Sequence, residues 1–164
     1  MTKSSGESSD IVVDASFAVL AVLPYSPRDT VLQHFAAWHQ ADRRILAPAL
    51  WLSEAVSVIR KQTYFDTLTQ AESRTATEDL WALGVTTVPI DLELCHSALR
   101  WAERLGQARA YDGFYLALAE RHEADFWTMD QRLKQHLQQI ESGLSVYQVP
   151  SSTSPPPSPP PSGP

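Results

Sequence analysis

Short apolar runs rich in β-branched residues alternate along the chain with segments whose apolar residues recur at helical spacing. The strand-like runs are 11–13, 45–47, 85–90, 125–128 and 144–149. Helices are expected at 15–23, 27–40, 48–64, 69–83, 91–105, 110–123 and 130–140. Because strands alternate with helices, the pattern predicts an α/β fold whose central, mostly parallel sheet is covered on both faces.

The first run, Ile11-Val12-Val13, is followed directly by a carboxylate, Asp14, and a hydroxyl, Ser16. Consecutive Val and Ile are typical of a strand covered on both faces, and ligands of open parallel sheets bind beyond the carboxyl ends of the strands. Asp14 is therefore expected in a site. The alternative is that Asp14 only caps the following helix, since Asp is among the best N-cap residues.

Three further acids are candidates to converge on Asp14. Glu54 lies within a helix, bordering its apolar face, where a carboxylate is costly unless it is paired or bound to a metal. Asp112 opens the apolar segment 113–120, and Asp130 follows a strand-like run as Asp14 does. The alternatives are a Glu54 directed to solvent and two acids at helix N-termini, where the helix dipole favours negative charge.

A cluster of these four acids has a chemical rationale. Crowded carboxylates raise one another's pKa unless cations lie between them. Oxygen ligands without His or Cys suit a hard ion such as Mg²⁺ or Mn²⁺, and such ions promote hydrolysis of phosphodiesters. The cluster therefore predicts a metal-dependent phosphodiesterase.

Composition narrows the class of protein. A chain of 164 residues with 43% hydrophobic content is sufficient for one domain. The net charge of −6 argues against a protein that coats nucleic acid, but it permits an enzyme with a local basic rim. Arg109, Arg132 and Lys134 flank the acids and are expected to line the substrate entrance. The alternative is that they are solvated charges at helix ends.

Cellular location and domain boundaries follow from simple features. Cys95 is the only cysteine, so no intrachain disulfide can form, and we expect a reducing, cytoplasmic compartment. No apolar run is long enough to span a bilayer. We expect a disordered segment at 1–9, a single domain at 10–149 and a disordered Pro/Ser-rich tail at 150–164.

Four motifs resemble those of the PIN domain family of metal-dependent nucleases, especially the VapC-like toxins of prokaryotic toxin–antitoxin pairs. In chain order they are Val12-Val13-Asp14-Ala15-Ser16, Ser53-Glu54-Ala55-Val56, Tyr111-Asp112-Gly113-Phe114-Tyr115-Leu116-Ala117-Leu118-Ala119 and Thr128-Met129-Asp130-Gln131-Arg132-Leu133. Two positions depart from the usual family pattern. Ser57 stands where Asn often follows the Glu, and Gly113 stands where Ala is usual.

The resemblance implies an α/β/α sandwich that acts as a Mg²⁺- or Mn²⁺-dependent endoribonuclease, the toxin of a toxin–antitoxin pair. It assigns Asp14, Glu54, Asp112 and Asp130 to the metal, and the hydroxyls of Ser16 and Thr128 to metal-bound water or substrate phosphate. A housekeeping RNA-processing nuclease and a PIN-fold binding module that has lost catalysis are the alternatives.

The resemblance also implies a homodimer and a complex with an antitoxin. Candidate interface anchors on helices 29–40 and 69–83 are Phe35, Trp38, Leu80 and Trp81. The alternative, which we expect for Trp81, is that these residues pack into the protomer's own core. The spacing of all five tryptophans indicates core positions: Trp38, Trp51, Trp81, Trp101 and Trp127.

Overall fold

The computed structural model describes residues 10–25 and 27–150. The segment 1–9 and, apart from Pro150, the tail predicted to be disordered lie outside the described residues. Within the described residues, five strands form one all-parallel sheet in the order β3-β2-β1-β4-β5: β1 (Asp10–Val13), β2 (Arg44–Pro48), β3 (Thr86–Val88), β4 (Asp125–Trp127) and β5 (Val146–Tyr147). The α/β fold predicted from the sequence is therefore confirmed.

The helices follow the predicted order with shifted ends: α1 (Ala15–Ala18), a 3₁₀ turn η1 (Val19–Ala21), α2 (Arg28–Gln40), α3 (Trp51–Tyr64), α4 (Gln70–Ala82), α5 (Leu92–Arg104), α6 (Tyr111–Arg121) and α7 (Gln131–Gln139). The prediction that a helix begins at Pro48 is wrong. Pro48 is the last residue of β2, paired with Val88, a strand end where a missing backbone N–H is tolerated. Among the described residues, no helix is long and apolar enough to cross a membrane.

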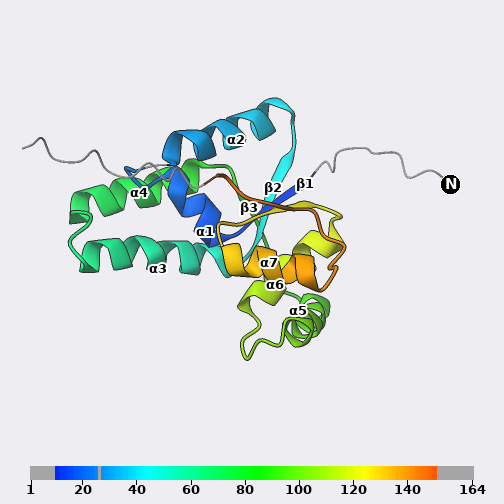
Figure 1. Ribbon diagram of the computed structural model, residues 1–164. Helices are drawn as coiled ribbons and strands as arrows, with labels where there is room; N and C mark the ends of the chain where they lie inside the picture. The colour runs from blue at the N-terminus through cyan, green and yellow to red at the C-terminus, as the bar shows by residue number, and fades with distance from the viewer. Residues whose placement is uncertain (1–9, 26, 151–164) are drawn as a thin grey trace, which may run out of the picture.

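Helices cover both faces of the sheet, and two neighbouring residues of β4 show this. Side chains of successive strand residues point to opposite faces. The ring of Phe126 lies 6.5 Å from that of Tyr115 on α6, whereas the ring of Trp127 lies 5.1 Å from that of Trp38 on α2. Helices α2 and α6 therefore pack on opposite faces, as Figure 1 shows.

Helices α3 and α4 form a hairpin that extends beyond the sheet (Figure 1). Of the proposed interface anchors, Phe35, Trp38 and Leu80 are buried in the protomer's core and are not available to a partner. Trp81 on α4 is instead 76% exposed, so the prediction that it packs in the core is wrong. The helical spacing of Leu80 and Trp81 could not show which of two adjacent residues faces inward.

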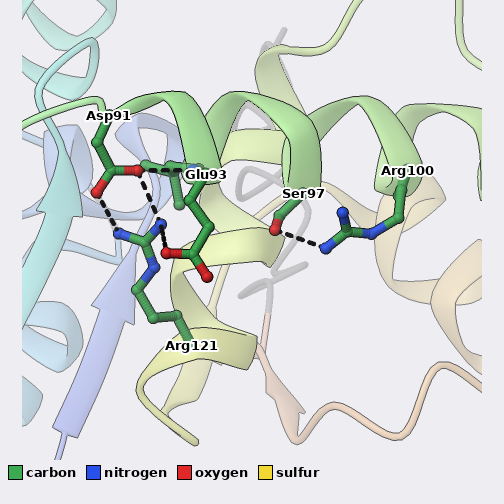
Figure 2. Close-up of polar contacts among 6 residues, drawn as sticks. Asp91, Glu93, Ser97, Arg100 and Arg121 are labelled. Atoms are coloured by element: carbon green, nitrogen blue, oxygen red, sulfur yellow. Dashed lines mark hydrogen bonds and ion pairs between the residues drawn. The ribbon is translucent and has the colours of Figure 1, made fainter.

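Helices α5 and α6 are packed closely against each other. At one end, the Arg121 guanidinium donates two hydrogen bonds of 2.9 and 3.0 Å to Asp91, the N-cap of α5 (Figure 2). This pairing lowers the pKa of Asp91 to about 2. Nearer the start of α6, Gly113 lies against the backbone of Ala98: a Cβ atom at Gly113 would be 2.3 Å from the Ala98 carbonyl oxygen.

Replacing Gly113 with Ala is therefore expected to lower the free energy of unfolding, although Ala is the better helix former. Overpacking destabilises by about 1–3 kcal/mol, and the better helix propensity of Ala stabilises by about 1 kcal/mol. The free energy of unfolding should therefore fall by up to roughly 2 kcal/mol. Urea unfolding measures it. Gly106→Ala is the control, since no atom lies within 4 Å there and only backbone strain at φ +60° is added. A Gly113→Ala protein more stable than wild type would contradict the close packing.

Candidate active site

Asp14 lies immediately beyond β1 and is the N-cap of α1. Its Oδ1 accepts hydrogen bonds from the Ser16 hydroxyl at 2.7 Å and from the Phe17 backbone N–H at 2.9 Å, and its Oδ2 accepts one from the Thr128 hydroxyl. The capping role and the position at the carboxyl end of the central strand therefore hold together. The capping role is confirmed, and it does not exclude a role of Asp14 in a site.

The Asp14 side chain is almost fully buried, with 8% of the residue exposed. Burial disfavours the charged form and raises the pKa of Asp14 to about 6, although its three hydrogen bonds act in the opposite direction. The Asp112 charge raises it further. A buried carboxylate whose ionisation is this costly is typical of functional sites.

The hydroxyls of Ser16 and Thr128 connect the ends of β1 and β4. The Ser16 oxygen accepts a hydrogen bond of 2.9 Å from the backbone N–H of Met129, and the Thr128 oxygen accepts one of 2.9 Å from that of Asp130. The two hydroxyl oxygens lie 3.4 Å apart. Both hydroxyls also donate to Asp14, so they fix its orientation.

Asp130 repeats the arrangement of Asp14 one strand away. It follows β4 and caps α7, its Oδ1 accepting hydrogen bonds from the backbone N–H groups of Arg132 at 2.9 Å and Leu133 at 3.0 Å. Unlike Asp14, Asp130 is exposed. Its Oδ2 accepts no hydrogen bond from the described residues, so the exposed carboxylate keeps one oxygen for another ligand at the same edge of the sheet.

Asp112, the second residue of α6, does not cap that helix, because the N-cap is Ala110. Its Oδ2 accepts a hydrogen bond of 2.8 Å from the side-chain amide of Gln107. Burial raises the pKa of Asp112, and the neighbouring charge of Asp130 raises it further. Asp112 is therefore not an N-cap, but it does lie in the first turn of α6, as the alternative of an acid at a helix N-terminus allowed.

Glu54 is partly buried within the first turn of α3. Its Oε2 accepts a hydrogen bond from the Tyr115 hydroxyl of α6. Burial raises the pKa of Glu54, and the Asp112 charge acts in the same direction. Glu54 is thus directed inward toward α6 rather than outward to solvent.

Electrostatic coupling links the four acids into one set. Asp112 raises the pKa of both Asp14 and Glu54, and Asp130 raises that of Asp112. Oxygen donors alone and mutual repulsion fit a hard divalent cation. Within 10–25 and 27–150, no three His, Cys, Asp or Glu side chains are already close enough to hold an ion.

The three cations proposed for the substrate entrance differ in exposure. Arg109 in the loop before α6 and Arg132 in the first turn of α7 are exposed, while Lys134 is partly buried. In the described part of the chain, none of the three forms an ion pair. All three remain available to an anion.

Two residues that contact the acids were missed by sequence reasoning. Tyr115 lies three residues after Asp112 and so on the same side of α6, a signal that could have identified it. Gln107 lies in an irregular loop and gave no such signal. Ser57, the position that departs from the family pattern, is exposed and donates to the Ser53 carbonyl at 2.7 Å. The hydrogen bond to Glu54 comes from Tyr115 instead.

The sequence itself identifies the family. A sequence model described as the PIN domain matches residues 11–136, which is more than half of the chain. The chain belongs to the PIN domain family. No protein with a curated description matches the sequence.

Solved PIN structures resemble this one across most of its length. A Pyrobaculum aerophilum protein is 17% identical, with a TM-score of 0.60 and 87% of each chain covered. VapBC2 from Rickettsia felis, bound to a promoter DNA fragment, is 12% identical, with a TM-score of 0.60 and coverage of 85% of this chain and 98% of that one. The Mycobacterium tuberculosis toxin VapC20, described as cleaving the sarcin-ricin loop, is 14% identical, with a TM-score of 0.58 and coverage of 76% and 93%. At these identities the likeness establishes the shared PIN fold.

Proposed function

We propose that this PIN domain protein is a Mg²⁺- or Mn²⁺-dependent endoribonuclease and the toxin of a toxin–antitoxin pair. The observation that carries the proposal is the electrostatic linkage of Asp14, Glu54, Asp112 and Asp130 at the carboxyl end of the sheet. Among solved structures with this fold, one is described as a toxin that cleaves the sarcin-ricin loop, and another as VapBC2 bound to a DNA fragment from its promoter.

Each residue has a distinct role in this proposal. A divalent cation bound by the acids supplies positive charge to the scissile phosphate and the departing oxygen. Asp14, Asp112 and Asp130 hold that cation, and Glu54 holds it or orients the attacking water. The hydroxyls of Ser16 and Thr128, already fixed by backbone amides, orient Asp14 and contact phosphate or water.

The substrate class is tested by offering RNA and DNA of one sequence to the purified protein in Mg²⁺. Internal cuts in a circular single-stranded RNA, with the matching DNA left intact, are the expected result. A circular substrate excludes trimming from chain ends. Cleavage of the DNA alone, or products only from a linear RNA with free ends, would contradict an endoribonuclease.

A binding module that has lost catalysis is the alternative of a different class. The presence of all four acids argues against it. Each of the four carboxylates accepts at least one hydrogen bond, which favours its charged form. Calorimetric titration with Mn²⁺ distinguishes the two. A binding module that has lost catalysis should show no Mn²⁺ binding that depends on Asp14 and Asp112.

The partners proposed are RNA, an antitoxin and a second copy of the chain. Of the four anchors considered from the sequence, only Trp81 on α4 is exposed enough to contact another protein. Light scattering at micromolar concentration tests the homodimer, and a monomer there would refute it. A small adjoining reading frame that encodes an antitoxin-like protein would separate a toxin from an RNA-processing nuclease.

Arg109 and Arg132 are proposed to contact RNA phosphates, with Lys134 beside them. Replacing both arginines with Ala is expected to raise KM for RNA and reduce the slope of log KM against log salt by roughly 0.7 per lost contact. Arg100→Ala is the matched control. Arg100 is an exposed cation on α5 that bonds only to Ser97 in Figure 2. Equal salt dependence in the double variant and wild type would refute the assignment.

A further inference from the structure

Tyr115 occupies a central place in the active site. It lies within α6 and is 3% exposed, and its ring packs against that of Phe126 in β4, with centroids 6.5 Å apart. Because Tyr115 follows Asp112 by three residues, both side chains lie on one side of the helix. The ring is thus fixed by the core while its hydroxyl reaches the acids.

The Tyr115 hydroxyl connects two further elements. It donates a hydrogen bond to Glu54 Oε2 on α3, and the backbone N–H of Ala15 donates toward the same oxygen. Ala15 directly follows Asp14, so one hydroxyl couples the Glu54 carboxylate to the start of α1. This contact spans three elements that are distant in sequence.

The other three acids are held differently. Asp14 and Asp130 accept backbone N–H groups at the starts of helices, and Asp112 accepts the Gln107 amide. Glu54 lies in the first turn of α3 but accepts no backbone N–H from the described residues, and its longer side chain has more rotamers to lose on ordering. The Tyr115 hydroxyl is therefore the contact that selects one orientation of Glu54.

We propose that Tyr115 is a positioning residue that fixes Glu54 toward Asp112, and that it thereby sets the affinity of the acidic site for its divalent cation and the rate of RNA cleavage. This inference rests on the proposed function. Tyr115 does not itself contact RNA in this account. Its effect is transmitted through the Glu54 carboxylate.

The test is Tyr115→Phe, which keeps the ring against Phe126 and removes only the hydroxyl. The dissociation constant for Mn²⁺, measured by calorimetry, is expected to rise about 10–100-fold, the usual effect of losing a hydrogen bond to a metal ligand. The kcat for RNA should fall with it, while KM for RNA stays unchanged. Tyr111→Phe, an identical change at a 57% exposed position of the same helix, should match wild type.

A double-mutant cycle with Glu54→Gln shows whether Tyr115 acts through Glu54. In the Glu54→Gln background, Tyr115→Phe should cause no further loss of Mn²⁺ affinity, because the two residues are coupled. Independent, additive losses would overturn the inference, and so would wild-type Mn²⁺ affinity in Tyr115→Phe. RNA cleavage by the wild-type protein tests the nuclease proposal separately. If the wild-type protein binds Mn²⁺ without cutting RNA, the proposed function is refuted but the positioning role of Tyr115 is not.

Discussion

Asp14→Asn is expected to abolish RNA cleavage in Mg²⁺ while the fold stays intact. Asn matches the shape of Asp, so its side-chain oxygen can still accept from Ser16 and the Phe17 N–H, while its amide donates to Thr128. What is lost is the negative charge at the carboxyl end of the central strand. Removing a hydrogen bond that only supports a metal ligand lowers metal affinity or activity about 10–100-fold. Removing a direct ligand should therefore lower the rate of RNA cleavage more than about 100-fold.

The same substitution should stabilise the metal-free protein. Burial raises the pKa of Asp14 from 3.8 to about 6, so ionising this carboxyl at neutral pH opposes folding. At about 1.4 kcal/mol per pKa unit, Asn in its place should add roughly 1–3 kcal/mol to the free energy of unfolding at pH 7 in EDTA. Asp66→Asn, which removes the same charge from an exposed turn, is the control. Full RNA cleavage by Asp14→Asn would contradict the assignment.

The metal-free wild-type protein is expected to become less stable as pH rises from about 4 to about 7. Asp14 in the folded state keeps its proton up to about pH 6, whereas in the unfolded chain it loses it near 3.8. Between these values the folded state binds more protons, so the free energy of unfolding falls with rising pH. The shift of Asp14 alone corresponds to a loss of up to about 3 kcal/mol. Glu54 and Asp112, whose pKa values are also raised, act in the same direction.

Urea unfolding in EDTA at several pH values measures this effect, and Asp14→Asn isolates the contribution of one group. The variant should lose distinctly less stability than wild type between pH 4 and 7. Asp91 does not interfere. Its pKa is lowered to about 2 by Arg121, so its stabilising contribution is lost only as pH falls below about 4. If the free energy of unfolding depends on pH in the same way for wild type and Asp14→Asn, the pKa of Asp14 is not raised by burial and the prediction is refuted.

The parts of the site that follow strands could be predicted from sequence because the sheet is parallel. Asp14 and Thr128 end adjacent strands, and the pairing of Val13 with Trp127 brings them together. The position of Asp130 could be predicted in the same way, because it also comes shortly after a strand, β4. Glu54 and Asp112 depend on how α3 and α6 are rotated about their axes, which apolar spacing fixes only approximately. Their partners, Tyr115 and Gln107, are set by tertiary contacts.

Other differences have local physical causes. Pro48 is compatible with both a strand end and the start of a helix, so sequence could not decide between them. Trp81 is exposed although it is large and apolar, because its neighbour Leu80 occupies the inward position on α4. The sequence showed only that Gly113 stands where Ala is usual in the family. Only the structure shows that the Ala98 carbonyl occupies the space of its missing side chain, next to Asp112.

The central claim is that the four acids form one cation-dependent site that cuts RNA. Its most direct test is RNA cleavage by a single wild-type preparation in Mg²⁺, then after excess EDTA, then after Mg²⁺ is restored above the chelator. Cleavage, no cleavage and recovered cleavage are expected in that order, with Asp14→Asn inactive throughout. Cleavage that continues in EDTA, or folded wild-type protein that leaves RNA intact in both Mg²⁺ and Mn²⁺, would contradict it.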